Sequence, residues 1–266
     1  METITENKNR ILKLFRDKKQ QILSVFFTAG FPELNDTEAI IKSLAESGAD
    51  MIEIGMPFSD PIADGPTIQN SNYIALKNGI TLPKIFDQLK EIRKEVDIPL
   101  LLMGYINPVL QYGIEKFCSD CAETGIDGVI LPDLPVIDYQ KFYKETFDRY
   151  GLFNIFLITP QTSEARIRMI DDCSQGFIYM VSSASTTGAK TGISEQQIQY
   201  FERIRNMELS NPLLIGFGIS DRETFETASK YASGAIIGSA FIKLLEENSK
   251  NYQTAIKNYI HTVKGI

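Results

Sequence analysis

The chain has 266 residues, 43% of them hydrophobic and 23% charged, and its formal net charge is −7. This composition is typical of a globular protein with a full apolar core, so folding should depend on neither disulfides nor a metal. The acidic balance disfavours a general nucleic-acid binder, which usually presents a basic surface.

The first segment, METITENKNRILKLFRDKK, has the pattern of an amphipathic helix and lacks the apolar region of a signal peptide. No apolar stretch approaches the roughly 18 residues of a membrane-spanning helix. We therefore expect a cytoplasmic protein with no membrane contact and an extra helix before the first strand.

Short apolar runs alternate with helical patterns over the rest of the chain. Runs that are apolar on both faces are typical of strands in a buried parallel sheet. They cover Ile22–Thr28, Met51–Met56, Leu100–Tyr105, Gly128–Leu131, Leu152–Ile158, Phe177–Val181, Leu213–Phe217 and Ala235–Ile237. About eight such units fit a TIM barrel better than an open sheet. With no linker to divide them, residues 1–266 are expected to form a single α/β domain, a (β/α)8 TIM barrel with an extra N-terminal helix.

The intervening helical patterns include residues 36–48, 82–96, 163–173 and 195–207. Capping residues are expected where helices begin, at Asp36, Ser163, Ser194 and Ser220. The C-x-x-C pair Cys118 and Cys121 lies inside the expected helix Ile114–Thr124, where both residues share one face. We interpret the pair as small, semi-buried residues and not as a redox or zinc motif.

Glu53 interrupts the second apolar run and, by alternation, shares a face with Met51 and Gly55. If that face lines the barrel, the carboxyl group lies near the C-terminal mouth, where desolvation raises its pKa. Such a carboxyl suits acid–base chemistry near neutral pH in a chain whose only histidine, His261, is expected on the surface of the last helix. The alternative is a glutamate that pairs with a neighbouring Lys or Arg, and the residue alone does not decide between them.

The loop that follows holds Asp60 and Asp64 among prolines, which stiffen the backbone. These acids are either positioned carboxylates or members of ordinary turns. Two later glycine-rich loops follow the expected seventh and eighth strands, where TIM barrels often bind phosphate. Backbone N–H groups and a helix N-terminus would supply the donors, although the glycines could simply turn the chain. The candidate phosphate ligands are Gly216, Gly218, Gly238 and Ser239.

The segment EIGMPFSDPIADGPTIQ, residues 53–69, resembles the signature of the tryptophan synthase α subunit family. The resemblance extends over nearly the full length. It includes FTAGFP at 27–32, LLMGYINPVLQYG at 101–113, VILPDLP at 129–135, STTGA at 185–189, IGFGIS at 215–220 and GAIIGSAFIK at 234–243. It implies a lyase that cleaves indole-3-glycerol phosphate to indole and glyceraldehyde 3-phosphate in tryptophan biosynthesis.

The resemblance also implies roles for single residues. Glu53 is expected to protonate C3 of the indole and to take the hydroxyl proton of the glycerol chain. Asp64 is expected to accept the indole N–H and stay ionised, with its charge helping to keep Glu53 protonated. Tyr179 is expected near the glutamate. The expected walls of the indole slot are Phe26 and Tyr105, and the alternative for both aromatic side chains is packing in the apolar core.

Loop 6 departs from the common family pattern. Thr187 and Gly188 resemble the part of this loop that closes over the substrate. Ser183, however, stands where many members have arginine, and Thr186 replaces an apolar residue. Loop 6 therefore differs from the common family pattern, whereas both catalytic acids of that pattern are intact.

The family passes indole to a pyridoxal-phosphate β subunit in an αββα assembly, and the resemblance implies that partner here. The chain itself is expected to need no cofactor and no metal. The residues expected to face the β subunit are Pro57, Phe58, Ser59, Asp60, Pro61, Asn107 and Pro108. Three alternatives stay open: another phosphate-binding barrel that acts on a sugar phosphate, a non-catalytic activator of a β subunit, and a lyase that releases indole without a partner.

Overall fold

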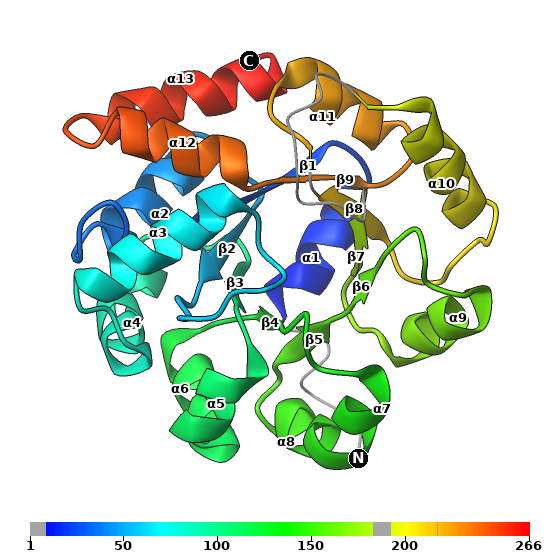
Figure 1. Ribbon diagram of the computed structural model, residues 1–266, viewed down its shortest axis with the longest axis horizontal. Helices are drawn as coiled ribbons and strands as arrows, with labels where there is room; N and C mark the ends of the chain where they lie inside the picture. Colours follow the sequence, from blue (N-terminus) through cyan, green and yellow to red (C-terminus); the bar gives the residue numbers. More distant parts are fainter. Residues whose placement is uncertain (1–8, 183–192, 217) are drawn as a thin grey trace.

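The computed structural model describes residues 9–182, 193–216 and 218–266. Within these ranges, parallel strands form a ring surrounded by helices (Figure 1). The strands are β1 Ile22–Thr28, β2 Met51–Gly55, β3 Leu100–Met103, β4 Gly128–Ile130, β5 Phe153–Ile155, β6 Leu157–Ile158, β7 Ile178–Val181, β8 Leu213–Gly216 and β9 Gly234–Ile237. Their order in the sheet is β5-β4-β3-β2-β1-β9-β8-β7-β6.

The predicted fifth strand, Leu152–Ile158, is two strands in the structure. β5 pairs with β4 and β6 pairs with β7, and only Phe156 separates them in the chain. The carbonyl of Phe156 accepts a hydrogen bond from the backbone of Tyr179 (2.9 Å). The ring of strands is therefore closed by the covalent link from β5 through Phe156 to β6. The predicted TIM barrel is confirmed, with its fifth strand divided in two.

The helices of the described ranges form the outer layer, apart from α1 (Figure 1). The α-helices, with α1 included, are α1 Arg10–Asp17, α2 Thr37–Glu46, α3 Pro66–Lys77, α4 Leu82–Leu89, α5 Ile106–Tyr112, α6 Ile114–Thr124, α7 Val136–Asp138, α8 Lys144–Arg149, α9 Glu164–Cys173, α10 Glu195–Arg205, α11 Arg222–Ser229, α12 Ser239–Glu247 and α13 Tyr252–Lys264. No helix of the described ranges has the length and apolar character needed to span a bilayer.

Most of the expected helix starts are confirmed. Ser163 and Ser194 cap α9 and α10 with their side chains. Asp36 occupies the N-cap of α2 without a side-chain capping bond. The prediction of Ser220 as a cap is wrong by one residue: Asp221 caps α11, because its carboxylate reaches the backbone N–H of Thr224 (2.9 Å). In α6, Cys118 and Cys121 are buried free thiols, as expected.

The apolar core has two parts. One fills the space between the strands and the outer helices, and the other fills the barrel interior. The interior cluster contains Met51 from β2 together with Ile11 and Phe15 from α1. Because Met51 faces inward, the alternation expected for Glu53 is confirmed.

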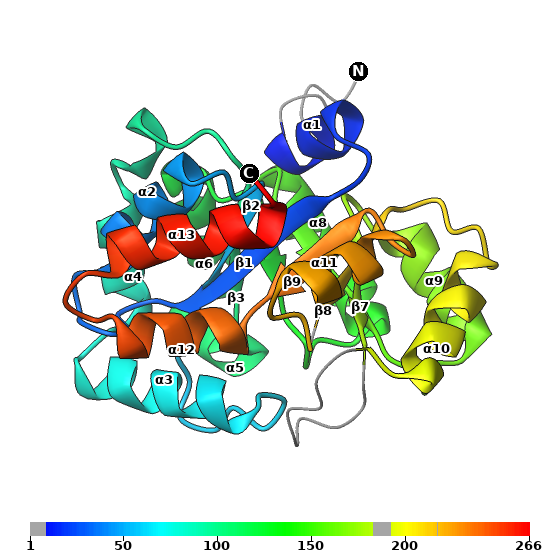
Figure 2. The ribbon, with the colours of Figure 1, turned by 90° about the horizontal axis from the view of Figure 1, so that it is seen from above.

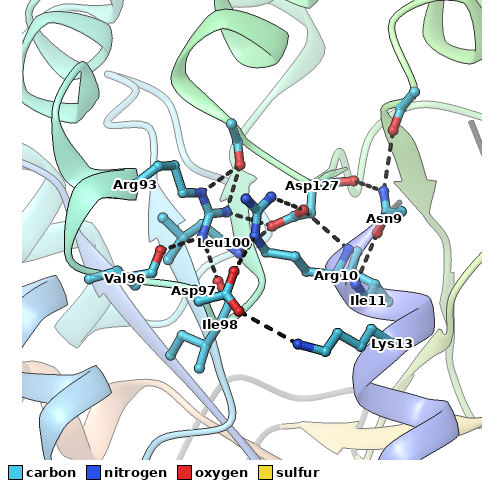
Figure 3. A network of polar contacts seen from close by, with 12 residues as sticks. Asn9, Arg10, Ile11, Lys13, Arg93, Val96, Asp97, Ile98, Leu100 and Asp127 are labelled. Atoms are coloured by element: carbon cyan, nitrogen blue, oxygen red, sulfur yellow. Dashed lines mark hydrogen bonds and ion pairs between the residues drawn. The ribbon is translucent and has the colours of Figure 1, made fainter. Parts of the chain in front are cut away.

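Helix α1 closes the N-terminal end of the barrel (Figures 1 and 2). Gly128 and Gly176 make room for it, since a Cβ atom at either position would lie 2.9–3.0 Å from the side chain of Ile11. Asn9 caps the helix and donates hydrogen bonds to the carbonyl oxygens of Asp127 (2.8 Å) and Gly151 (3.2 Å) (Figure 3).

An ion network fixes α1 to the strand ends (Figure 3). The buried carboxylate of Asp127 accepts from Arg93 (2.6 Å), from Arg10 (3.1 Å) and from the backbone of Leu100 (3.0 Å). Burial lowers the pKa of Arg93 to about 10, so its guanidinium stays charged at neutral pH. The interior is therefore sealed at this end, and substrate must approach from the opposite mouth.

Candidate active site

The side chain of Glu53 on β2 is fully buried inside the barrel and lies in register with Phe26 on β1 and Leu101 on β3. The hydroxyl of Ser24, also on β1 and fully buried, donates to Oε1 of Glu53 (2.8 Å). The other oxygen, Oε2, is buried without a hydrogen-bond partner among the described residues. The two oxygens of this carboxyl group therefore differ in what they contact.

Burial raises the pKa of Glu53 to about 8, against an ordinary value of 4.5, and the Ser24 hydroxyl opposes the shift. Desolvation disfavours the charged form, so the group is mostly protonated at neutral pH. We expected the charge of Asp64 to help raise this pKa. That explanation is wrong, because burial is the cause that raises the pKa of Glu53. A neutral carboxyl group at this position can act as a general acid.

Asp64 lies in the loop between β2 and α3, half-buried. The hydroxyl of Tyr105 donates to its Oδ2 (3.1 Å) and accepts from the backbone of Ala63 (2.9 Å). Burial raises the pKa of Asp64 to about 6, and the Tyr105 hydrogen bond opposes this rise. At pH 7 the two carboxyl groups are therefore in different states, with Asp64 mostly ionised and Glu53 mostly protonated.

Tyr179 is buried on β7 and faces into the barrel with the interior cluster. Burial, followed by the charges of Glu53 and Asp64, holds the pKa of its phenol well above the ordinary range. Gly216 on the adjacent β8 makes room for this ring: a Cβ atom at Gly216 would lie 2.2 Å from the Tyr179 hydroxyl oxygen. The sequence indicated a phosphate ligand at Gly216, and the structure adds this steric reason for a glycine.

Three predicted residues, Phe26, Asp64 and Tyr105, line one pocket at the mouth of the barrel. The glycine at position 55 leaves room for the ring of Phe26, since a Cβ atom added at Gly55 would lie 2.8 Å from that ring. The sequence prediction missed other members of the lining: Met56, Asn72, Met103, Gly104 and Pro132. All but Asn72 lie at a strand end or within two residues after one, which is the signal that could have indicated them.

A larger hollow lies at the opposite end of the molecule, beside α1. Several of its charged side chains already pair with one another, as Arg10 does with Asp97 (3.2 Å) and Lys42 with Glu95 (2.6 Å). It is far from the strand ends that carry the two acids, and we do not assign it to the active site.

The candidate phosphate residues lie at the ends of neighbouring strands. Gly216 ends β8, in register with Ile236 of β9, and Gly218 follows in the left-handed region (φ 78°). Gly238 is the N-cap of α12, without a side-chain capping bond, and exposed Ser239 is the first residue of that helix. The first-turn N–H groups of a helix lack intrahelical acceptors, so this end of α12 suits an anion.

Four positions of the expected loop 6, Ser183, Thr186, Thr187 and Gly188, lie outside the described residues. The expected partner-facing residues lie on the loop after β2 and in the first turn of α5, at the same mouth as the pocket, and each is half-exposed or exposed. They are Pro57, Phe58, Ser59, Asp60, Pro61, Asn107 and Pro108. The ring of Phe58 also contacts that of Tyr105 (centroids 5.2 Å apart). His261 lies half-buried on α13, in the outer helical layer.

The comparisons with known proteins agree with this geometry. A family model described as tryptophan synthase alpha chain matches residues 12–265. A tryptophan synthase alpha chain from Flavobacterium psychrophilum is 62% identical, with 90% of this chain and 94% of the relative covered. One from Christiangramia forsetii is 58% identical, with 97% and 99% covered.

Solved structures agree as well. The alpha subunit from Legionella pneumophila superposes with a TM-score of 0.87 at 32% identity, covering 97% of each chain. A chain of the tryptophan synthase complex from Pyrococcus furiosus gives 0.83 at 35% identity, covering 93% of this chain and 99% of its own length. By sequence, fold and site, the chain belongs to the tryptophan synthase alpha chain family.

Proposed function

We propose that Glu53 and Asp64 are the two carboxyl groups through which the chain carries out its reaction. That reaction is the cleavage of indole-3-glycerol phosphate to indole and glyceraldehyde 3-phosphate, the α reaction of tryptophan biosynthesis. The observation that supports these roles most directly is the difference between the two pKa values, about 8 for Glu53 and about 6 for Asp64. Paired carboxyl groups held in opposite protonation states suit acid–base catalysis without histidine.

Glu53 acts first as an acid. The indole carbanion is a poor leaving group, so the protonated carboxyl group gives its proton to C3 of the indole ring. The bond between C3 and the glycerol chain then breaks, and its electron pair returns to the ring. The hydroxyl on the neighbouring carbon loses its proton to Glu53 and becomes the aldehyde, so that the glutamate ends the cycle protonated, as it began.

Asp64 stabilises the charge that develops when C3 is protonated. The positive charge is shared with the indole nitrogen, and an ionised carboxylate that accepts the N–H stabilises it by several kcal/mol. Tyr105 holds this carboxylate through its hydroxyl. Tyr105 therefore has a second role beside that of a wall of the indole slot, which it forms with Phe26.

Other residues bind and orient the substrate. Gly216, Gly218, Gly238 and Ser239 are proposed to hold the phosphate through backbone donors and the α12 N-terminus. Tyr179 contributes a neutral phenol beside Glu53. Thr187 and Gly188 are proposed to belong to the loop that closes over the bound substrate.

The partner is proposed to be a tryptophan synthase β subunit in an αββα assembly. The β subunit would supply pyridoxal phosphate, while this chain, one cytoplasmic domain over residues 1–266, uses no cofactor or metal of its own. Asp60 on the loop after β2 and Asn107 in α5 are exposed at the same mouth as the pocket, so a partner seated there would receive indole directly.

The test follows indole release from indole-3-glycerol phosphate, with and without a β subunit, in wild type and in Glu53→Gln and Asp64→Asn. We expect slow release alone, activation by the β subunit, and a loss of at least about 100-fold in kcat for Glu53→Gln. Glu123→Gln, at an exposed position on α6, is the matched control and should behave as wild type.

Two results would contradict the proposal. Fast release without a partner would support the stand-alone lyase. No release under either condition, with the β reaction still stimulated, would support the non-catalytic activator, and the roles of Glu53 and Asp64 would be wrong.

A further inference from the structure

Ser24 is an unusual residue for its place. It is fully buried on β1, between Met51 of β2 and Ile236 of β9 in the register of the sheet. A hydroxyl buried among apolar side chains costs free energy unless it forms a hydrogen bond. The bond it forms is the one to Oε1 of Glu53 (2.8 Å), across two adjacent strands.

This bond makes the Glu53 carboxyl group asymmetric. Oε1 accepts from Ser24, whereas Oε2 is sealed from solvent without a hydrogen-bond partner among the described residues. A carboxyl group with one oxygen held by a rigid strand cannot rotate freely about its last torsion. Its second oxygen is therefore presented in one direction.

We propose that Ser24 is a positioning residue that anchors Oε1 of Glu53 and so assigns the proton transfers to Oε2. This inference rests on the proposed function of Glu53. The proton leaves Oε2 for C3 of the indole. After the carbon–carbon bond breaks and its electron pair returns to the ring, the glycerol hydroxyl proton returns to the same oxygen. Ser24 contacts neither reacting atom and acts only through Glu53.

The groups that face Glu53 support this reading. β1 contributes Ser24 and Phe26, and β3 contributes Leu101. From β7, Tyr179 interacts with Glu53, and it also feels the charge of Asp64. Tyr179 stays neutral because burial raises the pKa of its phenol, and Ser24 is the hydroxyl whose hydrogen bond lowers the pKa of Glu53. Removing the Ser24 hydroxyl should therefore raise that pKa further.

The experiment compares wild type with Ser24→Ala by two independent readouts. The first is the titration of Glu53, followed by NMR of ¹³C-carboxyl-labelled glutamate and assigned by the resonance that disappears in Glu53→Gln. The second is the pH dependence of kcat for indole release, whose alkaline limb should follow the deprotonation of Glu53. In Ser24→Ala both should move to higher pH by about one unit, the scale of a lost hydrogen bond to a carboxylate. We also expect kcat at neutral pH to fall about tenfold with KM within about twofold, since the carboxyl group loses its orientation.

Two further variants separate positioning from packing. Ser24→Thr keeps a hydroxyl and should restore the alkaline limb toward wild type. Ser47→Ala removes another buried serine hydroxyl, one that donates to the backbone of Ser43 at the end of α2 (2.6 Å). It should cost stability and leave both readouts in place. Circular dichroism verifies that each variant is folded.

An alkaline limb that stays in place in Ser24→Ala overturns the inference, and the NMR readout identifies the step that failed. If the Glu53 resonance is also unmoved, the Ser24 contact has no effect on the carboxyl group. If the resonance moves while the limb does not, the contact is real, but Glu53 is not the group whose titration limits the reaction, and the proposed function fails with the inference.

Discussion

Replacing Glu53 by Gln should make the protein more stable at neutral and alkaline pH. The folded chain raises the pKa of this carboxyl group from 4.5 to about 8. Between these values the folded state holds a proton that the unfolded state has lost, so the free energy of unfolding falls as pH rises. A difference of about 3.5 units corresponds to about 5 kcal/mol above pH 8, and to about 3 kcal/mol at pH 7.

Glutamine removes this dependence because it does not titrate. Its amide still accepts from Ser24, and it places an NH2 group where Oε2 lies without a partner among the described residues, at a cost of about 1–3 kcal/mol that does not vary with pH. The slope of stability against pH is therefore the diagnostic quantity. Asp64 titrates in both proteins and cancels in the comparison.

The assay is urea unfolding of wild type and Glu53→Gln at half-unit steps from pH 5 to pH 9. The difference between the two free energies of unfolding should change in favour of the variant by several kcal/mol over this range. Glu123→Gln, where the charge is exposed, should follow wild type. Parallel curves for wild type and Glu53→Gln would refute the argument that the fold buries this carboxyl group at a cost.

Three further predictions concern other residues. Tyr105→Phe removes the donor that lowers the pKa of Asp64, so the acid limb of the kcat profile should move upward from about pH 6; a fixed limb would exclude this hydrogen bond as the cause. Gly216→Ala places a Cβ atom 2.2 Å from the Tyr179 hydroxyl oxygen. We expect kcat to fall at least about tenfold, because a small displacement of the Tyr179 ring beside the reacting groups is enough for such a loss. Wild-type kinetics in this variant would show that the ring moves aside freely. Asp127→Asn breaks a buried ion network at the end of the barrel opposite the active site. Urea unfolding should show that the free energy of unfolding falls by about 3 kcal/mol, while the pH profile of kcat stays unchanged. A shifted profile would contradict the separation of the two ends of the barrel.

The sequence predicted the barrel well because strand pattern and loop chemistry agree along most of the chain. It failed at Phe156, where the run Leu152–Ile158 stays apolar although the pairing partner changes from β4 to β7. The hydrophobic pattern of a segment does not indicate which neighbouring strand its backbone pairs with. It also misplaced the cap of α11, because Ser220 and Asp221 are both good capping residues and only the backbone geometry separates them.

The candidate site was predictable where a residue departs from its surroundings, as Glu53 does in an apolar strand. Ser24 was missed because a small hydroxyl in a strand is an ordinary residue until its neighbour across the sheet is known. The link between Tyr105 and Asp64 was missed for the same reason, since the two residues are far apart in the chain and meet only at the mouth. Contacts of this kind depend on strand register, which one sequence does not specify.

Helix α1 has a further consequence, for the order in which the molecule is assembled. Asn9 bonds to Gly151, and the ring of Phe15 contacts that of Phe177 (centroids 5.7 Å apart). During synthesis these partners emerge long after α1 itself, so α1 can reach its native place only late in folding. Ile11 and Phe15 expose apolar surface throughout that interval. The nascent chain is therefore prone to aggregation at α1 until the strands that receive this helix have formed.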